Sequence, residues 1–236
     1  MEQIYTIPIN EAFDRSRESE DGACPLCLLC ETVTETEVDR ILGASMMEPD
    51  VRIRTNREGF CRSHYAMLLG KKNRLGLALM LESHLDEVSR DLREHGPAAL
   101  LTPAASRPLR RLGSREESCY LCGRIGETMG HMVENIVYMA AHDSEFLRKL
   151  GAQPWCCLPH YRRLLAYAKG ELRGRSFHDF YHLLSEIEER RMQLLREQIG
   201  GFCQKFDYRY AQQPWEGERD APERVIRFLR GCEADC

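Results

Sequence analysis

Residues 24–27 read CPLC and residues 61–64 read CRSH, and the same two motifs return as CYLC at 119–122 and CLPH at 157–160. The gap between CxxC and CxxH is 33 residues in the first half of the chain and 34 in the second. Val38 and Val133 hold equivalent places after each CxxC, as do Ile41 and Ile136. The chain therefore contains an internal repeat with an offset of 95 to 96 residues.

The repeated motifs carry the ligand types of a metal site. A CxxC turn presents two sulfurs to one point, and a CxxH turn presents a sulfur and an imidazole, so together they supply a closed Cys₃His set. Such ligands favour Zn²⁺, whereas Ca²⁺ and Mg²⁺ need oxygen ligands. We expect the motifs of each half to pair, giving two structural Zn²⁺ sites. The predicted ligands are Cys24, Cys27, Cys61 and His64 in the first half and Cys119, Cys122, Cys157 and His160 in the second.

An iron–sulfur cluster is the alternative cofactor, because Cys30 extends the first motif to CPLCLLC. The chain has 11 cysteines in all. A disulfide framework is not expected, because the cytoplasm keeps thiols reduced. The sequence assigns no role to five of the cysteines, which are Cys30, Cys156, Cys203, Cys232 and Cys236.

Composition indicates a globular cytoplasmic protein. The 236 residues are 43% hydrophobic and 30% charged, with a net charge of −4, so neither nucleic acid nor an anionic membrane is expected as a partner. The N-terminus lacks the basic and apolar regions of a secretory signal. The longest apolar stretch is far shorter than the ~20 residues that cross a bilayer.

Hydrophobic periodicity predicts a mainly α-helical protein of two tandem modules, each clamped by a Cys₃His site. Residues 125–140 and 77–92 carry one apolar helical face each, and a further long helix is expected from Ser176 to Gly200. Short β candidates at 4–9 and 205–210 are predicted to form at most a small terminal pairing. The expected organisation is a first module at 1–95, a proline-containing linker at 96–117, a second module at 118–200 and a C-terminal extension at 201–236.

The stretch from Met46 to Leu85, with CPLC upstream and FCQKFDYRY downstream, resembles an uncharacterised bacterial family of similar length that is classed as a domain of unknown function. The resemblance covers nearly the whole chain. Some members of that family carry an automatic label as ABC transporter substrate-binding proteins, which the absence of an export signal here does not support. The resemblance implies Cys and His motifs at the eight predicted ligands and names no substrate.

The sequence favours a structural or regulatory zinc scaffold that binds a protein partner, and it leans away from an enzyme. Three alternatives stay open. Oxidation of the thiols would make a redox or zinc-responsive switch. A nucleic-acid-binding zinc protein would contact phosphates through two groups of basic residues, which are Arg107, Arg110, Arg111 and Arg115 in the linker and Arg162, Arg163, Lys169, Arg173 and Arg175 after the second CxxH. His178 and His182, in the sequence HDFYH, would be the ligands of a metal-dependent hydrolase.

Overall fold

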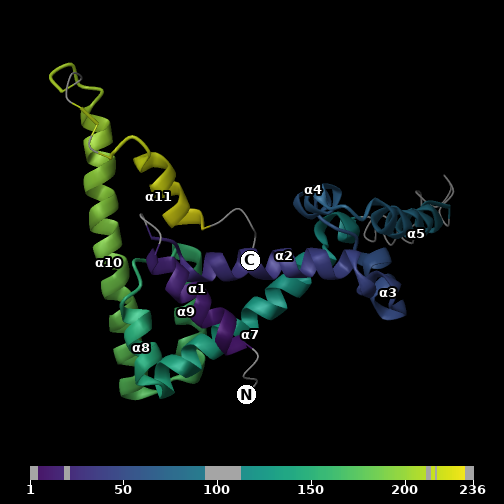
Figure 1. Ribbon diagram of the computed structural model, residues 1–236, viewed down its shortest axis with the longest axis horizontal. Helices are drawn as coiled ribbons and strands as arrows, with labels where there is room; N and C mark the ends of the chain where they lie inside the picture. The colour runs from purple at the N-terminus through teal and green to yellow at the C-terminus, as the bar shows by residue number, and fades with distance from the viewer. Residues whose placement is uncertain (1–4, 19–21, 94–112, 211–213, 216, 232–236) are drawn as a thin grey trace, which may run out of the picture. The chain divides into compact units, whose positions relative to one another are not determined.

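The protein is all-helical over the residues that its computed structural model describes, which are 5–18, 22–93, 113–210, 214–215 and 217–231 (Figure 1). No strand occurs in these ranges, as the mainly α prediction requires. None of the helices in the described ranges is long and apolar enough to cross a membrane. The elements are α1 (Thr6–Glu18), α2 (Pro25–Leu42), the 3₁₀ helix η2 (Ala44–Met47), α3 (Pro49–Glu58), α4 (Arg62–Gly70), α5 (Arg74–Arg93), α7 (Tyr120–His142), α8 (Ser144–Gly151), α9 (Leu158–Glu171), α10 (Gly174–Gln204) and α11 (Ala221–Arg230).

Residue contacts divide the chain into two compact units. The first unit contains Met1–Glu31 and Met129–Asp235, and the second contains Thr32–Thr128. Helices α2 and α7 each have residues in both units. Each unit therefore draws on both halves of the sequence repeat, and the units do not coincide with the expected modules at 1–95 and 118–200.

The first unit is built on buried aromatic side chains. Phe13 of α1 packs against Phe146 of α8 with ring centroids 5.2 Å apart. Trp155, which precedes α9, is buried against Phe228 of α11. The Arg191 guanidinium of α10 lies 4.8 Å from the ring centroid of Trp155. These contacts join α1 to α8, and they join α10 and α11 to the segment that leads into the second CxxH motif.

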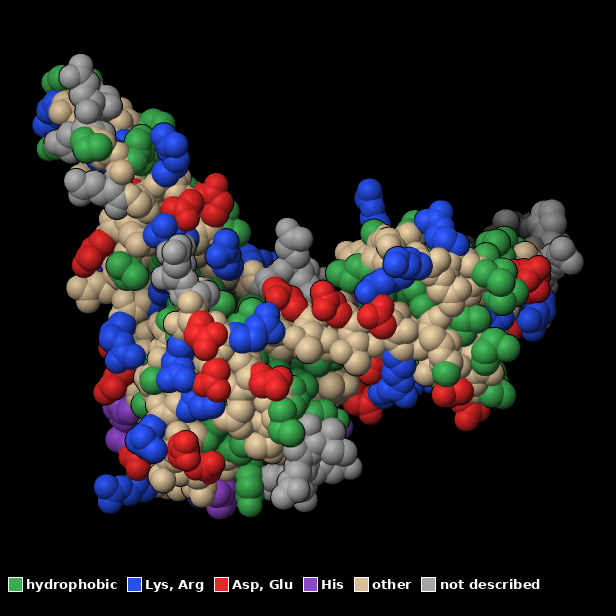
Figure 2. Space-filling model, viewed as in Figure 1, with side chains coloured by type: hydrophobic (Ala, Val, Ile, Leu, Met, Phe, Trp, Pro, Cys, Tyr) green, Lys and Arg blue, Asp and Glu red, His purple; other side chains and the backbone are tan. Residues whose placement is uncertain are grey.

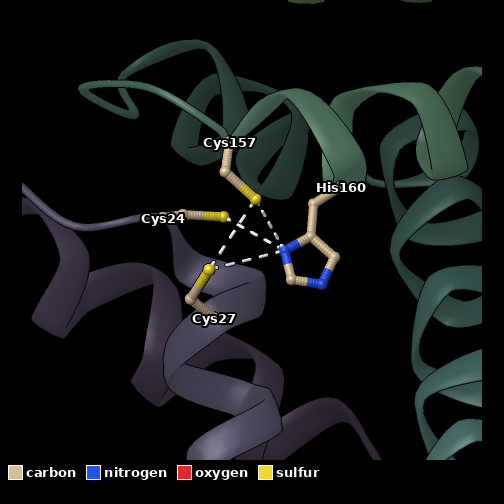
Figure 3. A group of neighbouring side chains, drawn as sticks. All are labelled: Cys24, Cys27, Cys157 and His160. Atoms are coloured by element: carbon tan, nitrogen blue, oxygen red, sulfur yellow. Dashed lines mark hydrogen bonds between the residues drawn. The ribbon is translucent and has the colours of Figure 1, made fainter. Parts of the chain in front are cut away.

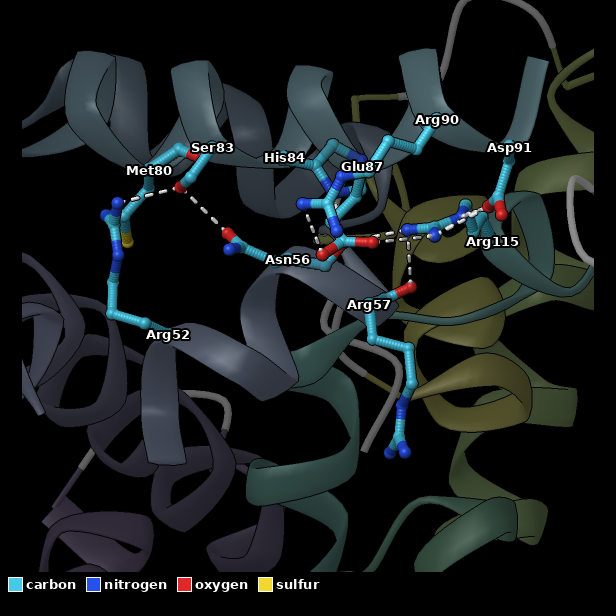
Figure 4. A network of polar contacts seen from close by, with 10 residues as sticks. All are labelled: Arg52, Asn56, Arg57, Met80, Ser83, His84, Glu87, Arg90, Asp91 and Arg115. Atoms are coloured by element: carbon cyan, nitrogen blue, oxygen red, sulfur yellow. Dashed lines mark hydrogen bonds and ion pairs between the residues drawn. The ribbon is translucent and has the colours of Figure 1, made fainter. Parts of the chain in front are cut away.

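The second unit is held by a polar network between α3, α5 and the residues before α7 (Figure 4). The Arg115 guanidinium donates to Asp91 Oδ2 at 2.7 and 3.0 Å, and also to the carbonyl oxygen of Asn56 at 2.7 Å. Arg52 of α3 donates to Ser83 of α5 at 2.7 Å. Arg115, one of the linker arginines named as candidate phosphate contacts, is thus engaged in contacts within the second unit.

The two β candidates are wrong within the described residues. Helix α1 contains residues 6–9, because Ile9, Ala12, Phe13 and Ser16 form one buried helical face. Residue 4 lies outside the described ranges. Residues 205–210 form turns after α10, where Phe206 and Tyr208 are exposed, so no buried face stabilises a strand there.

The helix predictions are confirmed in position and corrected at several ends. Helix α7 covers the predicted apolar stripe at 125–140, and α5 covers that at 77–92. Helix α10 begins two residues before Ser176 and continues through Gly200 and Gly201, because local propensity is outweighed by packing along a 31-residue helix. Most of the predicted linker lies outside the described residues, but its end, at 113–117, is helical.

Candidate metal centres

The eight predicted ligands gather into two groups of four, but not in the predicted pairs. The first cluster is Cys24, Cys27, Cys157 and His160, and the second cluster is Cys61, His64, Cys119 and Cys122. Within each cluster all potential ligand atoms lie within 4.8 Å of one another. Pairing within each half of the repeat is therefore corrected: each cluster combines the CxxC of one half with the CxxH of the other.

The first cluster has the dimensions of one tetrahedral ion site (Figure 3). His160 Nδ1 lies 3.5 Å from the sulfurs of Cys24 and Cys27 and 3.0 Å from that of Cys157, and the Cys27 and Cys157 sulfurs are 3.7 Å apart. A tetrahedron with ligands at about 2.3 Å for sulfur and 2.0–2.1 Å for nitrogen has S–S edges of about 3.8 Å and S–N edges of about 3.6 Å. The four side chains thus need little movement to hold one ion.

The second cluster has the same geometry, and its histidine also faces the cysteine sulfurs through Nδ1. His64 Nδ1 lies 3.1 Å from the Cys61 sulfur and 3.4 Å from those of Cys119 and Cys122. The sulfurs of Cys61 and Cys122 are 3.8 Å apart. Two clusters with matching edges indicate two equivalent ligand sets within one chain.

Each cluster forms where two helices begin. Cys61 and Cys157 are the N-cap residues of α4 and α9, and the histidine of each CxxH lies in the first turn that follows. The backbone N–H of the residue after each histidine donates to the N-cap carbonyl at 2.9 Å. Cys24 and Cys119 immediately precede α2 and α7, which place the second cysteine of each CxxC in their first turn. Because the N-terminus of a helix favours negative charge, this position stabilises thiolates.

Helix length explains why a CxxC does not pair with the CxxH that follows it in sequence. Helices α2 and α7 have 18 and 23 residues, so they carry the chain about 27 and 34 Å away from the CxxC at which they begin. The repeat spacing is compatible with either pairing, and this is the feature that the sequence interpretation missed.

Backbone contacts next to the motifs stabilise the observed pairs. In the second unit the Tyr120 N–H donates to the Gly59 carbonyl at 3.0 Å, and the Ser118 hydroxyl donates to the Glu58 carbonyl at 2.8 Å. In the first unit Gly22, with φ of +67°, packs so closely on Pro154 that a Cβ would lie 2.6 Å from the proline ring. The segments before paired motifs therefore lie side by side in both units.

The thiols influence one another's ionisation. Burial acts to raise the pKa of Cys24, but hydrogen bonds from Cys156, Cys157, Cys27 and His160 outweigh it and hold that pKa well below its usual value. The pKa of Cys122 is raised, first by burial and then by the neighbouring Cys119 and Cys61 thiols. Three thiols so close together do not all ionise unless a cation offsets their repulsion, so the ligand sets fit a divalent ion.

The two clusters differ in exposure. All four residues of the first cluster are buried, whereas Cys61, Cys119 and Cys122 of the second are only partly buried. The first cluster is covered by the end of α11, where Gly231 has a φ of +81° and a Cβ added to it would lie 3.2 Å from the Cys157 sulfur. Any side chain at 231 would therefore crowd this cluster.

Two residues beside the first cluster carry chemistry that the sequence did not reveal. Cys156 is fully buried, and its thiol hydrogen-bonds with Cys24. The Cys156 N–H donates to Glu188 Oε1 of α10 at 3.0 Å, and burial raises the pKa of Glu188 to about 8. The sequence pattern of α10 places position 188 beside buried apolar residues, but the pattern gives no reason for a carboxyl at a buried position. Cys30 is also buried, belongs to neither cluster and is disulfide-bonded, so the expectation of reduced thiols is wrong at this position. Cys203 is exposed, and Cys232 and Cys236 lie outside the described residues.

Comparison with known proteins gives a family and no further relatives. No curated protein and no solved structure matches the chain. The sequence profile of the family of unknown function DUF6062 matches residues 1–235. Since this match spans nearly the whole chain, the protein belongs to the family of unknown function DUF6062.

Proposed function

We propose that this protein is a cytoplasmic zinc protein in which two structural Zn²⁺ ions fix a helical scaffold that binds a protein partner. The observation that carries the proposal is the pair of Cys₃His clusters with tetrahedral edge lengths. Four protein ligands fill the coordination shell of zinc, which is typical of structural rather than catalytic sites.

The ligand sets favour zinc over an iron–sulfur cluster. Thiolate and imidazole ligands in tetrahedral arrangement suit Zn²⁺. The ligands of an iron–sulfur cluster are divided among two or more iron atoms, so the whole set is spread more widely than the 4.8 Å within which all four ligand atoms of each cluster lie here. Cys30, which prompted the iron–sulfur alternative, is outside both clusters.

The proposed ions would stabilise the scaffold by joining distant parts of the chain. Cys27 and Cys157 are 130 positions apart, and Cys61 and Cys122 are 61 apart. A structural zinc site contributes an apparent ~10–16 kcal/mol at neutral pH in zinc-finger peptides, which exceeds the loop-closure cost of about 4 kcal/mol for loops of this length. Metal binding would therefore be coupled to folding in both units.

An exposed apolar face on α5 supports a protein partner. Hydrophobic side chains reach the surface over α4 and α5 (Figure 2). Leu85 and Leu92 are 61% and 57% exposed among the described residues. With Ala78, Leu81 and Val88 they follow the alternating spacing of three and four residues that packs one helix against another. The proposed partner therefore presents an amphipathic helix to this face.

Metal analysis with chelation tests the zinc proposal. The full chain, purified without added metal, is expected to contain two equivalents of zinc by elemental analysis. Removal of the zinc by a chelator is expected to lower the helical circular dichroism signal, and restored zinc is expected to return it. A metal-free protein that keeps its full helical signal, or a chain that retains iron and inorganic sulfide, would contradict the proposal.

Cys156 favours a second candidate function, a zinc switch that responds to oxidation. Reaction of the Cys24 and Cys156 thiols with peroxide would form an S–S bond and break the O–O bond, with two electrons and two protons passing from sulfur to oxygen to give two waters. Loss of the Cys24 ligand would release the first ion. In the second cluster the residue equivalent to Cys156 is Phe60, which has no thiol that could form a disulfide. Peroxide is therefore expected to yield a Cys24–Cys156 disulfide in the wild type, and equal zinc release from Cys156→Ser would reject the switch.

A further inference from the structure

Two histidines lie one helical turn apart on the outer face of α10, in the first unit. His178 and His182 are both exposed, and the side chain of His178 is 68% exposed. Their Nε2 atoms are 3.0 Å apart and their ring centroids 4.1 Å apart. Side chains at positions i and i+4 share one helix face, so the α-helix itself holds the two nitrogens together.

The separation of these nitrogens fits two ligands of a single ion. With metal–nitrogen distances of about 2.0–2.1 Å, two imidazole nitrogens lie about 2.9 Å apart at a right angle and about 3.3 Å apart at the tetrahedral angle. The observed 3.0 Å falls between these values. The separation of the two nitrogens therefore suits both octahedral and tetrahedral ions.

Neighbouring side chains favour the form of His178 that binds metal. Asp179 Oδ1 lies 3.7 Å from Nδ1 of His178, the ring nitrogen that is not directed at His182. A carboxylate on this side of the ring attracts a proton on Nδ1 electrostatically, although 3.7 Å is too long for a hydrogen bond, and a proton on Nδ1 leaves the Nε2 lone pair for a ligand. Tyr181 packs edge-on against the His182 ring, with centroids 5.7 Å apart and an interplanar angle of 84°. Both rings therefore have a contact that limits their rotation.

We propose that His178 and His182 form a third metal site, which binds one divalent transition-metal ion such as Zn²⁺, Ni²⁺ or Cu²⁺ through their Nε2 atoms. Imidazole ligands select these ions over Ca²⁺ and Mg²⁺. Two protein ligands leave the remaining coordination positions to water or to a side chain of another molecule. The site is therefore exchangeable, in contrast to the two closed Cys₃His clusters, and it does not depend on the metal that those clusters hold.

The arrangement differs from that of a helical hydrolase motif. In such a motif the residue after the first histidine is the general base that acts on metal-bound water. Here the Asp179 carboxylate lies beside Nδ1 of His178 and within 3.6 Å of Arg175 Nε, instead of beside the shared Nε2 position. The geometry points to ion binding, with Asp179 as a positioning residue.

Titration of the dialysed full chain with Zn²⁺ tests the site. Calorimetry is expected to show one equivalent beyond the zinc that the protein retains through dialysis. NMR spectra of the imidazole groups are expected to show the His178 and His182 signals moving together. The double variant His178→Ala, His182→Ala is expected to lose this equivalent while it keeps the retained zinc and the helical circular dichroism signal.

A matched control and a positioning variant make the test specific. The double variant His131→Ala, His142→Ala removes two exposed histidines of α7 and is expected to keep the additional equivalent. Asp179→Asn is expected to weaken binding roughly 10-fold without abolishing it. The alternative is a simple hydrogen bond in which one Nε2–H donates to the other Nε2. Absence of the additional equivalent, or its persistence in His178→Ala, His182→Ala, would establish that alternative and overturn the proposal.

Discussion

The sulfurs of Cys27 and Cys157 lie 3.7 Å apart although 130 positions separate them in the chain. Their contact joins the CxxC of the first repeat to the CxxH of the second. The reciprocal contact, between Cys61 and Cys122, joins the other two motifs at 3.8 Å. Each Cys₃His set is thus made by side chains from both halves of the repeat.

The crossed pairing can be tested by counting the zinc bound to double variants. Cys24→Ser with Cys157→Ser affects only the first cluster, so this protein is expected to keep one zinc. Cys24→Ser with Cys61→Ser affects both clusters, so it is expected to lose both ions. Elemental analysis after dialysis measures the difference.

Pairing within each repeat predicts the reverse result for these two variants. The single variants Cys24→Ser, Cys61→Ser and Cys157→Ser serve as controls, since each is expected to lose one ion under either pairing. If Cys24→Ser with Cys61→Ser retained one zinc, the crossed arrangement would be wrong.

The eight Cys and His residues of the two clusters were predictable from sequence, but their pairing was not. CxxC and CxxH each fix a local turn, and their chemistry depends only on residues three positions apart. Pairing depends on where α2 and α7 lead the chain, and near-identical spacing in the two repeats makes both pairings acceptable. Contacts such as the hydrogen bond from the Tyr120 N–H to the Gly59 carbonyl distinguish the two pairings. They are made by backbone atoms, so no sequence motif marks them.

Helices with a continuous apolar face were also predictable, as α7 and α5 show. Segments without such a face were not. Helix α3 has half of its residues exposed and only Thr55 buried, so no periodic pattern marks it. Helix α1 begins near an Ile-rich segment that favours a strand by propensity, but burial of Ile9 and Phe13 on one face stabilises the helix.

Unequal burial predicts that chelators remove the two ions at different rates. The second cluster has three partly exposed cysteines, whereas the first is buried, so the second ion is expected to leave first. Zinc release to a coloured chelator should have two phases of equal amplitude. Cys61→Ser with Cys122→Ser is expected to remove the fast phase, and Cys27→Ser with Cys157→Ser the slow one. Loss of the slow phase from the first of these double variants would contradict the assignment.

Substitution of Gly231 is expected to weaken the first cluster specifically. Alanine at 231 would adopt a φ of +81° and place its Cβ 3.2 Å from the Cys157 sulfur. Gly174 also has a positive φ, of +54°, but a Cβ there meets no atom within 4 Å. Both Gly→Ala variants should lose about 1–2 kcal/mol of stability from backbone strain. Only Gly231→Ala should also release zinc faster in the slow phase, and equal release rates in the two variants would show that Gly231 does not limit the cluster.

Loss of the Arg115 guanidinium is expected to destabilise the second unit strongly. The Arg115 and Asp91 side chains are only 14% and 7% exposed, so Arg115→Ala leaves a buried carboxylate without its cation. Such losses typically cost about 3–5 kcal/mol. Arg90→Ala is the control, because the Arg90 side chain is 66% exposed in its pair with Glu87, and loss of such a surface pair costs about 0–1 kcal/mol. Denaturant unfolding of the zinc-loaded chain measures both, and equal costs would contradict a structural role for Arg115.

The buried carboxyl of Glu188 is expected to make stability fall as pH rises. Burial raises its pKa to about 8, against an ordinary value of 4.5, and Glu188 lies mostly out of water beside Cys156. Between these two values the folded protein keeps a proton that the unfolded chain releases, so the free energy of unfolding decreases with pH across this window. The contribution of Glu188 to the free energy of unfolding is fully present below pH 4.5, and it is lost as the pH rises through about 8.

Glu188→Gln removes this dependence, because the amide stays neutral and its oxygen can still accept the Cys156 N–H bond. The variant is expected to gain stability relative to the wild type as pH rises from 5 to about 8, and to show no such gain at the acid end. Glu189→Gln, at an exposed neighbouring position, is the control for the lost charge. Because zinc ligation is common to all three proteins, its own pH dependence cancels in the comparison. If the two variants changed with pH in parallel, the carboxyl of Glu188 would be ionised in the folded protein, and the buried neutral form would be excluded.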